Sequence, residues 1–363
     1  MPLRPRHLWY LLLLAVPAAL VLNGLHAGPV ARFIAAGVGI IPLAALMGRS
    51  TETLAARVGP HLGGLLSASF GNAAELILGL IALSKGLAPI VKASITGSII
   101  GNALLVFGLS VVVGGVRHRR QTFERTVVGL QSTLLVVAVI GLAVPSVLVH
   151  VLPASSEVHL SEEVAGIFLA VYLLNIVYSF VSRDREASLV HGPAEPSEAA
   201  SWRPWLALVV LLASTALVAV LSEVLVGAIE EAQARGYLEA WGMSEVFVGV
   251  VVLAVIGNAA ENSTAILMAY HNKVDLSLHI AIGSSLQIAL LVMPVLVFAS
   301  LVLGPQPLDL HFTLLELLAV GASGVVVHLV AADGQTHWME GVLLVAVYLI
   351  LAMAFYHLPA PAG

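Results

Sequence analysis

Gly71-Asn72-Ala73-Ala74-Glu75 is the stretch that decides the fold, because the same five residues return as Gly257-Asn258-Ala259-Ala260-Glu261. The second copy lies 186 residues after the first (257 minus 71), and the likeness continues at that offset. Two neighbouring segments also match: Gly97-Ser98 with Gly283-Ser284, and Leu104-Leu105-Val106 with Leu290-Leu291-Val292. A match that extends over neighbouring segments predicts that the chain is built as two related halves.

The composition places the chain in a lipid bilayer. Of its 363 residues, 59% are hydrophobic and only 10% are charged, against roughly a quarter charged in soluble domains. A helix needs about twenty apolar residues to cross the hydrocarbon core. Runs of that length predict an all-α integral membrane protein of about eleven transmembrane helices, near 8–24, 30–48, 62–84, 89–115, 126–150, 163–182, 204–229, 245–270, 275–303, 311–331 and 338–357.

An odd number of predicted spans separates the two copies of each motif, so the two halves cross the membrane in opposite directions. Inverted repeats of this kind are typical of secondary transporters, whose substrate site lies near the bilayer midplane at the repeat interface. We expect a leading transmembrane helix in residues 1–29, a first five-helix repeat in 30–182, a cytoplasmic linker in 183–203 and a second five-helix repeat in 204–363.

The positive charges predict the orientation. Cytoplasmic loops carry an excess of lysine and arginine. Alternating sides of the eleven spans receive twelve and four of the sixteen basic residues, so we expect a cytoplasmic N-terminus and an outside C-terminus. The group of twelve is Arg4, Arg6, Arg49, Arg57, Arg117, Arg119, Arg120, Arg125, Arg183, Arg185, Arg203 and Lys273. The short loops favour a prokaryotic cytoplasmic membrane.

Glu75 and Glu261 are the strongest candidates for a functional site. A carboxylate in hydrocarbon costs at least about 2.5 kcal/mol, so each needs a compensating partner. Asn72 and Asn258 lie three residues before these glutamates, on the same helical face. The adjoining predicted helices each add a polar face, so that the candidate metal ligands are Glu75, Glu261, Asn72, Asn258, Asn102, Gln287, Ser98 and Ser284.

This set of oxygen ligands suits a hard cation such as Ca2+, which takes six to eight oxygens. There are no cysteines, so thiolate metal sites are excluded. Two neighbouring glutamates that hold no cation favour taking up protons, and competition for one site is the simplest basis of exchange. Alternatively, the amides and hydroxyls only join helices, or the chain is a monovalent cation/H+ exchanger, a Na+/Ca2+ exchanger or a cation channel.

The chain resembles the calcium/cation antiporter superfamily, specifically its Ca2+/H+ exchanger branch. The likeness is carried by residues 71–75 and by the stretch from Gly257 to Pro294, with Asn272-Lys273-Val274-Asp275-Leu276 and Gly283-Ser284-Ser285-Leu286-Gln287-Ile288-Ala289. The resemblance implies Glu75 and Glu261 as shared ligands of Ca2+ and protons. It also implies Asn102 and Gln287 as ligands on the paired helices.

The resemblance implies a transporter and not an enzyme, with no cofactor. Its expected partners are Ca2+ and protons as substrates and the lipid bilayer, with a homo-oligomer left open. No long basic run suggests nucleic acid. Three further acidic residues receive no role from the sequence: Glu52, Glu223 and Glu316.

Overall fold

The computed structural model describes residues 11–58, 60–149, 151, 153–181, 202–240 and 243–358. The first half comprises α2 (Ala15–Gly24), α3 (Pro29–Val58), α4 (Pro60–Gly71), α5 (Ala73–Ser84), α6 (Ala88–Ile100), η1 (Gly101–Val106), α7 (Phe107–His118), β1 (Gln121–Thr122), α8 (Arg125–Leu148) and α9 (Ala154–Val181). The second comprises α10 (Pro204–Ala234), α11 (Tyr237–Ala240), α12 (Glu245–Phe247), η4 (Val248–Leu253), α13 (Ala254–Tyr270), α14 (Val274–Gln287), η5 (Ile288–Val292), α15 (Met293–Ser300), α16 (Leu314–Ala331), β2 (Gln335–Thr336) and α17 (Trp338–Tyr356).

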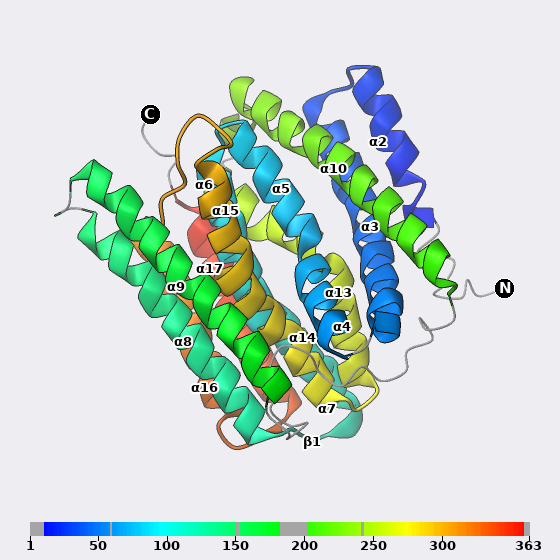
Figure 1. Cartoon of the computed structure of the whole chain (residues 1–363), viewed down its shortest axis with the longest axis vertical. Helices are drawn as coiled ribbons and strands as arrows, with labels where there is room; N and C mark the ends of the chain where they lie inside the picture. The colour runs from blue at the N-terminus through cyan, green and yellow to red at the C-terminus, as the bar shows by residue number, and fades with distance from the viewer. Residues whose placement is uncertain are drawn as a thin grey trace.

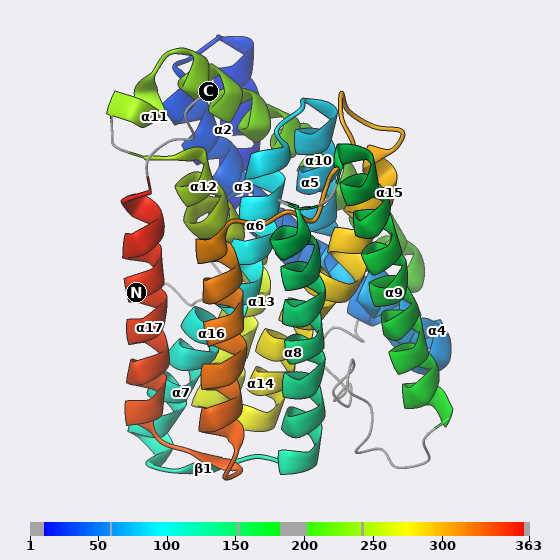
Figure 2. The ribbon, with the colours of Figure 1, turned by 90° about the vertical axis from the view of Figure 1, so that its left-hand side faces the viewer.

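The molecule is a bundle of long apolar helices (Figures 1 and 2). Nine helical segments among the described residues are long and apolar enough to cross a membrane. The other two predicted spans correspond to α2 and to the pair α4 and α5, whose apolar helices are shorter. The all-helical membrane architecture is therefore confirmed, apart from the two-residue strands β1 and β2, while the count of eleven stays a prediction.

The predicted span 62–84 is not one helix. It breaks at Asn72, whose φ of −104° and ψ of 26° lie outside the helical range, so α4 ends at Gly71 and α5 begins at Ala73. Glycine and asparagine are weak helix formers, which allows the break. The same pair in the second half, Gly257 and Asn258, remains inside α13, where the Asn258 side chain donates to the carbonyl of Ala254 at 3.0 Å.

Contacts at the two ends of the bundle agree with the predicted topology, in which successive spans cross the membrane in opposite directions. At one end, which we call the ribbon end, β1 pairs antiparallel with β2, and Gln121 Nε2 donates to the carbonyl of Ala269. At the opposite end, Lys92 contacts Asp309, and Arg32 contacts Glu231. Each contact joins helix ends or loops that the sequence places on the same side of the membrane. The predicted linker at 183–203 and the C-terminal Gly363 lie, except for residues 202 and 203, outside the described residues.

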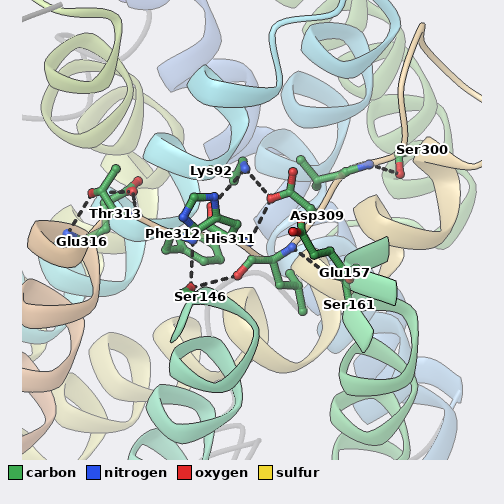
Figure 3. Close-up of polar contacts among 12 residues, drawn as sticks. Lys92, Ser146, Glu157, Ser161, Ser300, Asp309, His311, Phe312, Thr313 and Glu316 are labelled. Atoms are coloured by element: carbon green, nitrogen blue, oxygen red, sulfur yellow. Dashed lines mark hydrogen bonds and ion pairs between the residues drawn. The ribbon is translucent and has the colours of Figure 1, made fainter. Parts of the chain in front are cut away.

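An extended segment closes the second end, and we call its residues 304–313 the strap (Figure 3). The backbone N–H groups of Leu308, Leu310 and Phe312 donate to three serine hydroxyls on three helices: Ser300 of α15, Ser161 of α9 and Ser146 of α8, at 2.7, 3.0 and 2.9 Å. These three apolar side chains are buried. The intervening Asp309 accepts from Lys92 Nζ at 2.6 Å. The strap thus connects α6 with α8, α9 and α15 through hydrogen bonds.

Candidate cation site

The glutamates and their polar neighbours come from four crossing elements. Glu75 lies in the first turn of α5, directly after the break, and Glu261 lies within α13. The helix pair that crosses them contributes α6 with η1 from the first half and α14 from the second. Seven of the eight residues proposed as ligands from the sequence lie on these elements, and Asn72 lies at the break directly before α5. The eight are Glu75, Glu261, Asn72, Asn258, Asn102, Gln287, Ser98 and Ser284.

The six neutral residues of this set form one continuous hydrogen-bonded network. Asn72 Nδ2 donates to Gln287 Oε1 at 2.5 Å, and Asn72 Oδ1 accepts from Ser284 Oγ at 3.2 Å. Asn102 Nδ2 lies 3.0 Å from Ser284 Oγ and 3.2 Å from Asn258 Oδ1. Asn258 Nδ2 donates to Ser98 Oγ at 2.9 Å. Every one of these bonds joins one repeat to the other.

Each of the two glutamates lies beside the motif of the other repeat. A Cβ atom built on Gly257 would lie 3.2 Å from Glu75 Oε1, and one on Gly71 would lie 3.7 Å from Glu261 Oε1. Each carboxylate therefore occupies the space beside the glycine of the other repeat's motif. The two groups interact electrostatically. The Oε2 atom of each is buried and accepts no hydrogen bond from the described residues.

The possible metal ligands in this arrangement are hard oxygen atoms. Two carboxylates lie among amide and hydroxyl oxygens, and each carboxylate retains an oxygen whose lone pairs no described group uses. Unpaired buried carboxylate oxygens are costly, so they require a cation or a proton. Among the described residues, no group of three or more His, Cys, Asp or Glu side chains gathers as a metal site. The site therefore suits a hard cation or protons.

The site is closed toward the strap. There α6 packs so closely on η4 that a Cβ on Gly97 would lie 2.0 Å from the carbonyl oxygen of Val250. The equivalent position in the second repeat is Gly283, where the nearest described atom is Gln131 Nε2 at 4.0 Å. The close contact of α6 with η4 at Gly97 therefore has no counterpart at Gly283 among the described residues.

Sequence reasoning missed two features of the site. The π-helices η1 and η5 begin at Gly101 and Ile288, at nearly equivalent positions of the two repeats, and π-helical turns are frequent at functional sites. Ser94 lines a small cavity beside Glu75. Its spacing of one turn from Ser98 could have indicated this second hydroxyl. Glu316, which had no role, is buried in the capping box of α16 with Thr313.

Residues 28–181 and 206–357 match the family model described as sodium/calcium exchanger protein, so each half carries one copy. The chain belongs to this exchanger family. Over 97% of its length it is 42% identical to a Ca(2+)/H(+) antiporter of Synechocystis sp., of which the match covers 98%. Over 94% of its length it is 39% identical to the Ca(2+)/H(+) antiporter ChaA of Bacillus subtilis, of which the match covers 96%.

Solved structures of exchangers are similar to the structure of this chain. That of native YfkE matches with a TM-score of 0.83 at 37% identity, over 96% of this chain and 99% of the other. The H+/Ca2+ exchanger CAX matches with a TM-score of 0.70 at 14% identity, over 97% and 92%, and shows the shared fold. The sodium-calcium exchanger NCX_Mj matches with a TM-score of 0.55. The resemblance to the Ca2+/H+ exchanger branch of the family is thereby confirmed.

Proposed function

We propose that this protein is a secondary active antiporter that exchanges Ca2+, or a similar hard divalent cation, for H+ by alternating access. Its relatives in the exchanger family bear the name Ca(2+)/H(+) antiporter at about 40% identity over nearly the whole chain. The observation that carries the mechanism is the pair Glu75 and Glu261, each beside the motif glycine of the other repeat and each with one buried oxygen that no described residue pairs.

Charge balance explains why such a site exchanges ions. One Ca2+ or two protons neutralise the two carboxylates to the same net charge. Either loaded form can then reorient without a buried excess charge, whereas the empty form carries two negative charges and resists reorientation. The six neutral neighbours, which include Asn102 and Gln287, supply oxygens without changing this balance. Coupling between Ca2+ and proton movement follows from the shared site.

The asymmetric packing supports alternating access. The tight contact of α6 with η4 closes the strap side, and the equivalent contact in the other repeat is loose. With the orientation that the arginine and lysine distribution predicts, the strap faces the outside and the ribbon end faces the cytoplasm. We infer that this arrangement is the inward-facing one. In the outward-facing arrangement, the contact of α6 with η4 would be loose and the equivalent contact of the other repeat would be tight, which opens the strap side. The membrane we propose is a prokaryotic cytoplasmic membrane.

A vesicle experiment separates this function from its alternatives. In everted vesicles that contain the protein and have an acid interior, Ca2+ added outside should dissipate the pH gradient, and Na+ alone should do so poorly. A single Na+ leaves one carboxylate uncompensated. Collapse by Na+ with no response to Ca2+ would instead establish a monovalent cation/H+ exchanger. Calcium flux with no linked proton movement would establish a channel.

A further inference from the structure

The internal repeat allows the two sides of the site to be compared position by position. On the strap side, a cavity of about 10 Å3 beside Glu75 is lined by three apolar residues, Val91, Ile288 and Leu296, among others. At the 186-residue offset, the equivalent residues on the ribbon side are all polar: Ser277, Asn102 and Ser110. Ser94 shows the reverse difference, because it is polar on the strap side and its equivalent on the ribbon side is the apolar Ile280. At the positions of Val91, Ile288 and Leu296, the strap side therefore carries hydrocarbon and the ribbon side carries two hydroxyls and one amide.

Two of these hydroxyls are buried without a partner. Ser110 and Ser277 are both 0% exposed, and neither Oγ atom makes a hydrogen bond with any described residue. Some buried serines of the bundle, such as Ser323, bond to a carbonyl of their own helix, whereas Ser50, Ser132 and Ser222 elsewhere in the described bundle share the unpaired state of Ser110 and Ser277. Gln121, which is 2% exposed, likewise has an Oε1 atom that accepts no hydrogen bond from the described part of the chain. Buried polar groups of native proteins are satisfied almost without exception, commonly by ordered water.

The three groups lie in sequence from the site to the ribbon end. Ser110 follows Asn102 by eight residues and Ser277 precedes Ser284 by seven, so each lies about 10 to 12 Å from the site along its helix. One turn beyond Ser110, a Cβ on Gly114 would lie 2.1 Å from Gln121 Oε1. The helices α7, α13 and α14 pack against one another. Ser110 lies one turn before Gly114 on α7, Ser277 lies two turns before Ser284 on α14, and Gln121 bonds to Ala269 of α13.

We propose that hydrogen-bonded water between α7, α13 and α14 conducts protons between Glu261 and the ribbon end, past Ser110, Ser277 and Gln121. This route rests on the proposed function and deepens it, because it separates the proton path from the Ca2+ path. Each hydroxyl accepts a proton from one water molecule and passes its own to the next. A hydronium ion at the surface thus loses one proton, and the Glu261 carboxylate gains one.

The chemistry of this route suits protons and excludes Ca2+. A Ca2+ ion that leaves water needs six to eight replacement oxygens. The same three helices carry small buried residues in this region, Gly114, Ala265, Ala269 and Ala281. A Cβ on Gly114 would already lie 2.9 Å from the carbonyl oxygen of Ala269, so the helices approach too closely there for a hydrated ion. A proton moves by hopping along hydrogen bonds and needs no such space.

The test compares two kinds of exchange in proteoliposomes of the purified protein. Exchange of 45Ca2+ for unlabelled Ca2+ needs the Ca2+ path alone, whereas Ca2+/H+ exchange needs both paths. The variant Ser110→Ala/Ser277→Ala removes the hydroxyls, and Ser110→Leu/Ser277→Val copies the residues of the strap side. The matched control is Ser323→Ala, whose buried hydroxyl is bonded within α16.

We expect Ca2+/H+ exchange to fall at least about tenfold in both double variants, while Ca2+/Ca2+ exchange stays within about twofold of wild type and the control retains both. A factor of ten corresponds to about 1.4 kcal/mol in the rate-limiting barrier. Unchanged Ca2+/H+ exchange in both double variants would overturn the route, and so would an equal fall of the two activities. Absence of both activities from the wild type would instead contradict the proposed function.

Discussion

The two motif glycines show how single residues shape the site. Gly71 and Gly257 each leave room for the carboxylate of the other repeat, at 3.7 and 3.2 Å from the position of a Cβ atom. Six of the eight polar residues could be predicted because they follow the repeat, whereas Asn102 and Gln287 were predicted from their spacing to Ser98 and Ser284 and from the family resemblance. It could not predict these close approaches, or that Asn72 leaves the helix while Asn258 stays in it, because both depend on contacts between residues almost two hundred positions apart.

Gly257→Ala should weaken Ca2+ binding about tenfold, or about 1.4 kcal/mol, and more than Gly71→Ala. The new methyl group at 3.2 Å must push Glu75 aside, whereas 3.7 Å is ordinary van der Waals contact. Calorimetric Ca2+ titration of the purified variants measures the difference. Gly48→Ala is the control, because nothing described lies within 4 Å of its Cβ. Equal effects at Gly71 and Gly257 would refute the packing argument.

The apparent affinity for Ca2+ should fall as the pH falls. Protons and Ca2+ compete for the same carboxylate oxygens, so a higher proton concentration leaves fewer of them ionised. Titrations of 45Ca2+ binding at a series of pH values should show this fall in the wild type. Binding that does not change with pH would mean that protons and Ca2+ occupy separate sites.

The strap is the element that sequence reasoning did not foresee. Its three anchoring serines come from α8, α9 and α15, and no local pattern in 304–313 reveals them. Apolar spans were predictable because hydrocarbon requires about twenty apolar residues. The division of span 62–84 into α4 and α5 and the π-helices η1 and η5 were not, because their causes are side-chain packing and hydrogen bonds between repeats.

Ser146→Ala and Ser161→Ala should each destabilise the protein by about 1 to 3 kcal/mol, because each leaves a buried backbone N–H of the strap unpaired. Those groups belong to Phe312 and Leu310. Chemical unfolding in detergent measures the change. Ser263→Ala provides the comparison, since its exposed hydroxyl bonds only to its own helix. Stabilities indistinguishable from that control would show that the strap is not held by these hydroxyls.

At the scale of the whole molecule, the two halves interlock at one polar network and pack unequally around it. The contacts named above at the ribbon end and at the strap end join segments of the same predicted side. The sequence could predict this alternation from apolar runs and basic residues. Which side is closed could not be predicted, because two near-identical motifs give no reason for one to pack more tightly.

Reporter fusions in the linker at 183–203 and after Gly363 test the orientation. We expect a cytoplasmic signal from the linker and an outside signal from the C-terminus, because twelve of sixteen basic residues fall on the linker's side. A fusion between Lys85 and Ala88 should report the outside as well. The same signal from the linker and the C-terminus would mean that the number of spans between them is even, contrary to the inverted repeat.

The central claim is that Glu75 and Glu261 together hold either Ca2+ or protons. The most direct measurement is Ca2+-driven proton flux in proteoliposomes that contain wild type, Glu75→Gln or Glu261→Gln. Glutamine keeps the size and polarity of each side chain but can neither balance a cation nor take up a proton. Both variants should elute as folded protein and lose the flux, while Glu163→Gln, at an exposed position of α9, keeps it. Near-normal exchange in either glutamine variant would contradict the claim.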